Sequence, residues 1–181
     1  MNTSQPASFL NPERVIGYLE VTKGMTAADF GAGAGFYTLP LARKVGEDGK
    51  VFAFDIQKQA LDLIKSKARL EHLLNIETVL ADLELPEGAG LPAGSVNLVI
   101  ISNILFQVEK KAEVLQEAYR ILKTGGEIAV IEWDETQFLG GLPAEMRVGK
   151  RFAQSLLSRA GFSYDKEFEA GSHHYGLLYK K

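Results

Sequence analysis

The chain contains no cysteine, and this absence excludes several kinds of chemistry. Disulfide bonds, thiolate metal sites and cysteine nucleophiles cannot form, and we expect no metal site. The formal net charge at pH 7 is only −3, which gives no indication of a nucleic-acid partner. No apolar run approaches the length of a membrane span, and residues 1–8 lack the apolar core of a signal peptide. We therefore expect a cytoplasmic protein without membrane insertion.

The length and composition predict one ordinary globular domain. A chain of 181 residues is long enough to bury a full core. Its 46% hydrophobic and 24% charged residues are typical of soluble folded proteins. Because repeats and linker-like stretches are absent, we predict a single domain over residues 1–181, in which residues 1–22 form an N-terminal helix and lid segment.

The most informative feature that is present is a glycine-rich run, Asp29-Phe30-Gly31-Ala32-Gly33-Ala34-Gly35. It follows an apolar stretch at residues 25–30 that predicts a strand, and it precedes residues 36–45, which predict a helix. Glycines at such a turn let the backbone approach a ligand and point free N–H groups at it. Nucleotide-like ligands bind at these turns in doubly wound sheets. The dinucleotide pattern G-x-G-x-x-G fits poorly, because position 36 is Phe.

Strands and helices alternate along the chain. The expected helices cover residues 12–21, 36–45, 57–74, 109–123 and 146–160, and the expected strands cover residues 25–30, 50–55, 76–81, 96–102, 128–133, 162–168 and 175–179. Five strands separated by helices predict a parallel sheet with right-handed crossovers. The last two strands have no helix between them, so they must form an antiparallel hairpin through residues 170–172.

The acidic-x-G-x-G-x-G form of the glycine run resembles motif I of class I S-adenosylmethionine (SAM)-dependent methyltransferases. Residues 9–14, 97–103 and 122–126 resemble segments of the small-molecule branch related to quinone-ring methyltransferases. The resemblance covers residues 9–180. It implies a three-layer, doubly wound, Rossmann-like α/β fold whose seven-stranded sheet is mostly parallel, with an antiparallel last strand and the order 3-2-1-4-5-7-6. It also implies SAM as the cofactor and a small-molecule methyl acceptor.

The resemblance assigns cofactor contacts to residues at the strand ends. Asp55 closes the strand at 50–55, where a carboxylate can accept both ribose hydroxyl protons; the alternative is an exposed strand-end or capping aspartate. Asp82 resembles the segment at the adenine, or is only a turn aspartate. Asp29 resembles the motif I acid that stabilises the methionine ammonium. The full predicted set is Asp29, Gly31, Ala32, Gly33, Gly35, Asp55, Ile56, Asp82, Leu83, Ser102 and Asn103, of which the last two should face the reacting methyl.

The sequence departs from the resembled family at two positions. Asn97 stands where an acid is usual, and residues 104–107 read Ile-Leu-Phe-Gln where relatives often carry histidine. A charged catalytic base is therefore missing at that point. Methyl transfer from a sulfonium is an in-line displacement, so orientation and a dry site can supply much of the acceleration. A base is needed only where the acceptor must lose a proton.

Topology predicts the acceptor side of the site. Ligands of open parallel sheets lie beyond the carboxyl ends of the strands, and the hairpin at 170–172 should emerge at that edge. His173 and His174 should then lie near Trp133 and Asp134, which we predict as substrate residues. One histidine is the candidate catalytic proton acceptor, with Trp133 as an apolar wall. The alternative is that both histidines are rim residues without a role.

Two other classes of function stay open at this point. One is a non-catalytic methyltransferase-like module that works through a partner. The other is a nicotinamide (NAD)-dependent oxidoreductase, which the glycine spacing and the antiparallel tail disfavour. The chain could also form a homodimer, in which the second subunit supplies the lid over the acceptor.

Overall fold

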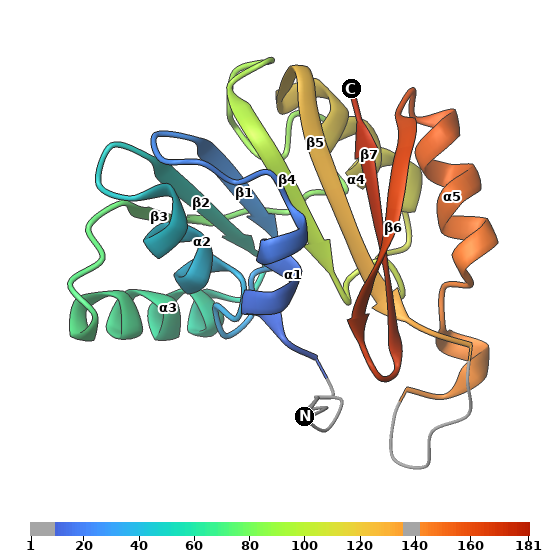
Figure 1. The fold of residues 1–181 in the computed structure, drawn as a ribbon, viewed down its shortest axis with the longest axis horizontal. Helices are drawn as coiled ribbons and strands as arrows, with labels where there is room; N and C mark the ends of the chain where they lie inside the picture. The colour runs from blue at the N-terminus through green and yellow to red at the C-terminus, as the bar shows by residue number, and fades with distance from the viewer. Residues whose placement is uncertain (1–9, 136–141) are drawn as a thin grey trace, which may run out of the picture.

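A computed structural model describes residues 10–135 and 142–181 (Figure 1). The helices are α1 (Pro12–Tyr18), α2 (Thr38–Val45), α3 (Lys58–Leu70), α4 (Lys111–Ile121), the short 3₁₀ helix η1 (Ala144–Met146) and α5 (Lys150–Arg159). The strands are β1 (Thr26–Phe30), β2 (Lys50–Asp55), β3 (Ile76–Leu80), β4 (Val96–Ser102), β5 (Leu122–Trp133), β6 (Ser163–Gly171) and β7 (His174–Lys180). None of the helices in these ranges is long and apolar enough to cross a membrane.

The strands form one seven-stranded sheet in the order β3-β2-β1-β4-β5-β7-β6. The pairs among β1 to β5 are parallel. Strand β7 runs antiparallel to both of its neighbours, β5 and β6. The predicted order and the predicted antiparallel hairpin are confirmed. The carboxyl ends of β4 and β5 and the β6–β7 turn lie at the lower edge of the sheet in Figure 1, which is where the candidate site is expected.

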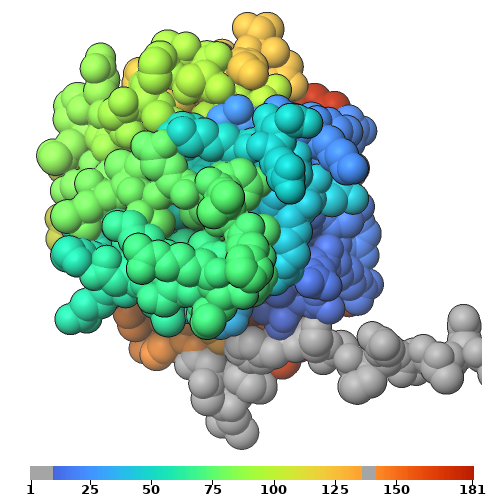
Figure 2. Space-filling view, turned by 90° about the vertical axis from the view of Figure 1, so that its left-hand side faces the viewer, coloured from blue at the N-terminus to red at the C-terminus, as the bar shows by residue number. Residues whose placement is uncertain are grey.

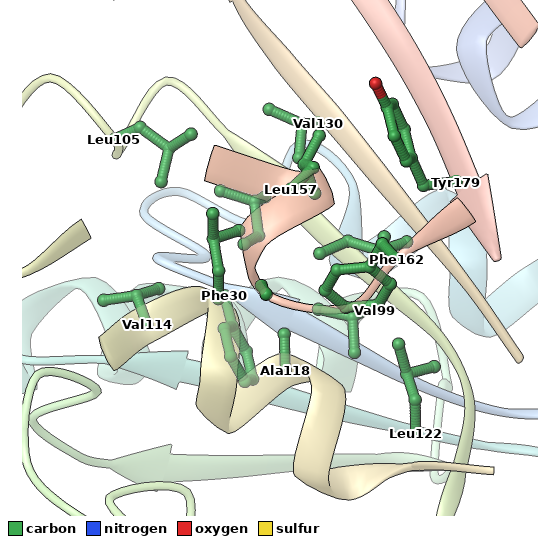
Figure 3. Packing of buried hydrophobic residues seen from close by; sticks show 14 of the residues in the cluster. Phe30, Val99, Leu105, Val114, Ala118, Leu122, Val130, Leu157, Phe162 and Tyr179 are labelled. Atoms are coloured by element: carbon green, nitrogen blue, oxygen red, sulfur yellow. The ribbon is translucent and has the colours of Figure 1, made fainter. Parts of the chain in front are cut away.

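Alternate residues of the central strands fill cores on both faces of the sheet. Val99 and Ile101 of β4 pack in a cluster with residues of α4 and α5 (Figure 3). Leu98 and Ile100 of the same strand pack in a second cluster with residues of α1 and α2. A smaller cluster holds α3 over Ala53 of β2. Burial of each such aliphatic side chain stabilises the fold by roughly 1.5–3 kcal/mol, and helices on both faces give the predicted three layers.

The junction between α4 and β5 differs from the sequence prediction. The helix was expected to reach residue 123 and to end at Gly125 and Gly126, but it ends at Ile121, and β5 begins at Leu122. Leu122 pairs with Val96 of β4, and Gly125 N donates to the carbonyl of Lys181 at 3.0 Å. The backbone groups of this segment thus find partners across the sheet, which a local pattern cannot reveal.

Three other helix boundaries differ from the prediction by three or four residues. Helix α1 ends at Tyr18 instead of residue 21. Helix α3 ends at Leu70 instead of residue 74, because His72 takes a left-handed conformation with φ +55° that interrupts a helix. Helix α5 begins at Lys150 instead of residue 146, since η1 and Gly149 precede it.

Candidate cofactor and acceptor site

The glycine turn after β1 has a backbone that side chains disfavour. Gly31, Gly33 and Gly35 have φ values of +72°, +50° and +81°, in the left-handed region that glycine adopts most easily. A Cβ on Gly31 would overlap the side chain of Ile104, and one on Gly35 would lie 3.0 Å from Cγ1 of Ile64. These two glycines therefore let the loop after β4 and helix α3 pack directly against the turn.

Asp55 ties the end of β2 to the same turn. Its Oδ2 accepts a hydrogen bond from Gly33 N at 2.8 Å, and its Oδ1 accepts one from Gln57 N at 2.8 Å. A carboxylate has about four acceptor sites, so further lone pairs stay available to a ligand. The space above Gly33 is open, because an added Cβ would meet nothing closer than the Gly31 carbonyl oxygen at 4.0 Å.

A pocket of about 430 Å³ lies at this edge of the sheet. The predicted residues that line it are Gly31, Gly33, Asp55, Ile56, Asp82 and Leu83. The side of the molecule that carries α3 and β3 faces the viewer in Figure 2. The volume lies in the usual range for small-molecule sites. Three carboxylates, Asp55, Asp82 and Glu84, line the pocket beside apolar side chains. This lining suits a nucleoside, whose hydroxyls and amine donate hydrogen bonds and whose base is flat and apolar.

Apolar side chains reach this pocket from the loops after β2, β3 and β4. Ile56 follows β2 directly and is 66% exposed, so its side chain offers an open apolar surface. The loop after β4 contributes Ile104, Gln107 and Val108, which sequence reasoning did not include. A larger hollow of about 650 Å³ lies at the amino ends of β2 and β3, beside Lys50 and Asn75. We assign no site there, because ligands of parallel sheets bind at the opposite edge.

Asp29 is buried between β1 and the start of α2. It is 2% exposed, and its Oδ2 accepts a hydrogen bond from Thr38 Oγ1 at 2.6 Å. Burial raises the pKa of the Asp29 carboxyl to about 6, although the hydrogen bonds from Thr38 oppose the shift. Sequence reasoning missed Thr38. The signal that could have found it is Asp29, because a buried acid needs a hydrogen-bond donor nearby.

The chain turns sharply after β4. Asn103 has a φ of +56°, its N–H donates to the Ile131 carbonyl at 2.9 Å, and its carbonyl accepts from Gln107 Nε2 at 2.7 Å. Within the described ranges its Oδ1 is buried without a hydrogen-bond partner. Ser102 and Asn103 therefore end β4 at the ligand edge, although neither lines the pocket at the glycine turn.

Glu132 of β5 is a further buried acid that sequence reasoning missed. Its Oε1 accepts a hydrogen bond from Leu105 N at 2.7 Å, whereas its Oε2 has no hydrogen-bond partner among the described residues. Burial raises the pKa of the Glu132 carboxyl to about 8. Glu132 thus holds the loop after β4, which reaches the pocket through Ile104. The sequence did carry a signal for this role: a glutamate within the apolar run at 128–133 would be buried and would need a hydrogen-bond donor.

The predicted acceptor residues come together at the end of β5. Trp133 pairs with His174 across β5 and β7, and their ring centroids are 4.5 Å apart. Asp134 N donates to the His173 carbonyl at 2.8 Å. Arg147, which sequence reasoning missed, donates to the Asp134 carbonyl at 2.8 Å and lies 5.8 Å from the centre of the Trp133 ring. His174 is 4% exposed and His173 is half-buried; their roles stay predictions.

The two departures from the resembled family lie in different places. Asn97 is at the amino end of β4, where its Oδ1 accepts from Thr26 N and from Lys123 Nζ, each at 3.1 Å. This position is at the edge opposite the pocket, so the missing acid does not remove a ligand contact there. Gln107, by contrast, lines the pocket in the segment where relatives often carry histidine.

Comparisons with known proteins find similar methyltransferases. The family described as "Methyltransferase domain" matches residues 21–172. The ubiquinone/menaquinone biosynthesis C-methyltransferase UbiE of Escherichia fergusonii is 35% identical over 117 residues, which are 64% of this chain and 45% of that protein. The demethylmenaquinone methyltransferase of Oceanobacillus iheyensis is 32% identical over 123 residues, which are 67% of this chain and 50% of that protein.

The chain therefore spans about half the length of these curated relatives. Among solved structures, a SAM-dependent methyltransferase from Aquifex aeolicus superimposes with a TM-score of 0.86 and 27% sequence identity. That match covers 94% of this chain and 89% of the other, so the similarity extends over nearly the whole chain.

Glu132 should make stability depend on pH. Because its pKa is raised in the folded state, the folded protein keeps a proton that the unfolded chain has lost above about pH 5. The free energy of unfolding should fall as pH rises from 6 to 8, by up to about 1.4 kcal/mol per pH unit. This window lies above the Asp29 pKa of about 6. Glu132→Gln, which keeps an acceptor for Leu105, should flatten the dependence.

Urea unfolding at a series of pH values, followed by circular dichroism, measures this effect. Glu113→Gln, at an exposed position of α4, is the matched control. Parallel pH curves for the wild type and Glu132→Gln would show that the buried carboxyl is not the source.

Proposed function

This chain belongs to the methyltransferase domain family, among the class I SAM-dependent methyltransferases, and we propose that it transfers the methyl group of SAM to a small-molecule acceptor. The observation that carries the proposal is the pocket at the glycine turn, in which Asp55 and Asp82 lie beside Ile56 and Leu83. SAM supplies a methyl group on a positively charged sulfur. The chain has to bind it, orient it and keep water away from it.

The pocket residues have distinct proposed contacts with SAM. Asp55, oriented by Gly33 N and Gln57 N, would accept from the two ribose hydroxyls. Ile56 and Leu83 would flank the adenine, and Asp82 would accept from its exocyclic amine. Asp29 would face the methionine ammonium. A nearby cation favours the charged form of a carboxyl, so this contact would lower the raised pKa of Asp29.

For the acceptor, we propose a ring compound of the kind that the relatives' names state, a precursor of menaquinone or ubiquinone. The support within this chain is the contact between the Trp133 and His174 rings at the end of β5. Trp133 would form an apolar wall for a flat ring. His174, which lies on the same face of the sheet as Trp133, would accept a proton if the ring must lose one; His173 would not.

Other parts of the proposal concern the whole protein. The weakly acidic net charge of −3 supports a small-molecule acceptor over a nucleic acid. We also propose that residues 1–181 form a single domain in which residues 1–22 act as a lid. The proposed location is the cytoplasm, and a homodimer is the alternative to a monomer. Helix α1 supports a covering role for the N-terminal segment, since Arg14 pairs with Glu169 of β6 at 2.8 Å. Residues 1–9 lie outside the described ranges.

Binding calorimetry with SAM and with NADH tests the cofactor. We expect micromolar binding of SAM and none of NADH. Asp55→Ala should weaken SAM binding by about 10- to 150-fold, because hydrogen bonds to a charged group contribute about 1.5–3 kcal/mol. Asp62→Ala, which removes a carboxylate from the outer side of α3 where it pairs with Lys58, is the control. Equal SAM affinities for Asp55→Ala and the wild type would refute the proposed ribose contact.

A turnover assay tests the acceptor. The protein is incubated with SAM and reduced demethylmenaquinone, and the methylated product is detected by mass spectrometry. A general base contributes about 10²- to 10⁴-fold, so His174→Ala should lose activity on that scale and His173→Ala should not. If neither variant changes turnover, the proton-acceptor role is wrong. If SAM binds but no acceptor is methylated, the non-catalytic alternative is favoured.

A further inference from the structure

Glu84 joins two walls of the pocket that come from separate strands of the sheet. One wall is the loop after β3 and the other is the loop after β4, and β2 and β1 lie between these two strands. Glu84 lines the pocket, and its Oε2 accepts a hydrogen bond from Lys110 N at 2.6 Å. Lys110 is the N-cap residue of α4. This hydrogen bond therefore connects the loop after β3 to the helix that follows β4.

The Lys110 N–H is one of the donors at a helix start that the helix itself leaves without a partner. In a capping box, a glutamate at the third position of the same helix accepts from it. Glu113 occupies that position in α4 and is exposed, but the acceptor is Glu84, 26 residues earlier in the chain than Lys110. The carboxylate of Glu84 is also favoured by the helix dipole. The cap of α4 thus comes from the opposite wall of the pocket.

The backbone of Glu84 orients Asp82, the residue proposed to accept from the adenine amine. Oδ1 of Asp82 accepts a hydrogen bond from Glu84 N at 2.9 Å. A carboxylate has about four acceptor sites, so Asp82 keeps lone pairs for a ligand. Glu84 therefore holds the Asp82 carboxylate through its own N–H, while its side chain holds the whole loop against α4.

We propose that Glu84 is a positioning residue, which holds Asp82 at the adenine amine of SAM by fixing the loop after β3 against α4. The inference rests on the proposed function. A wall that is already ordered spares the cost of ordering it when the ligand binds. Glu84 acts through Asp82, so it needs no contact of its own with the cofactor.

Calorimetry with SAM on variants of Glu84 tests the proposal. Glu84→Ala should bind SAM about two- to tenfold more weakly, the change that corresponds to ordering one further side chain on binding. Glu84→Gln keeps a carbonyl oxygen that can accept from Lys110 N, so it should bind SAM as the wild type does. Glu113→Ala, which removes an exposed carboxylate from the first turn of α4, is the matched control and should leave the affinity unchanged.

The Asp82→Ala background separates positioning from general damage to the fold. If Glu84 acts through Asp82, adding Glu84→Ala to Asp82→Ala should weaken SAM binding no further, because residues that act as one unit are not additive. An undiminished effect of Glu84→Ala in that background would overturn the proposal. Glu84 would then contact the cofactor itself or act by another route.

Thermal unfolding of the ligand-free proteins completes the test. Glu84→Ala should stay folded, because Glu113 is placed to cap α4 in its stead. A Glu84→Ala variant that fails to fold would overturn the proposal, since the hydrogen bond would then hold the fold and not the wall. Unchanged SAM affinity in Glu84→Ala would also overturn it, as would an equal loss in Glu84→Gln. A wild-type protein that does not bind SAM would instead refute the proposed function itself.

Discussion

The hydrogen bond from Gly33 N–H to the Asp55 carboxylate joins the ends of β1 and β2, and the pocket depends on it. Beside it, Ala32 N–H donates to the Phe54 carbonyl at 2.8 Å, so two hydrogen bonds set the distance between the glycine turn and β2. The glycines allow this geometry because φ is positive at each of them. The same carboxylate holds Gln57 N at the start of α3, so one side chain positions the turn and the next helix together.

Two buried acids, like Asp55, fix neighbouring segments around the site by accepting hydrogen bonds from them. Asp29 accepts from Thr38 at the start of α2, and Glu132 accepts from Leu105 N in the loop after β4. Each of these carboxyls connects the end of a strand to the loop or helix that borders the ligand edge. Burial raises the pKa of both, which is the cost of fixing loops by groups withdrawn from water. The site is thus preorganised by strand-end carboxylates.

The acceptor side depends on topology. Only because β7 lies antiparallel between β5 and β6 does His174 meet Trp133. The absence of a helix between the last two strands predicts the β6–β7 hairpin, whereas the place of β7 beside β5 was implied by the family resemblance. Arg147 and Thr38, which contact the predicted site residues Asp134 and Asp29, were not predicted. Their positions depend on which face a side chain points to and on how the loop before α5 returns to β5.

The sequence by itself determined the alternation of strands with helices, the glycine turn and the place of Asp55, because these follow from local patterns: apolar periodicity, glycine spacing, and an acid that closes an apolar run. The sheet order was implied by the resemblance to class I methyltransferases. Only the tertiary structure decided the beginning of β5 at Leu122, the packing of Ile104 on Gly31 and the burial of Glu132. Each of these rests on partners distant in the chain, and packing against such partners overrides local preference once the core forms.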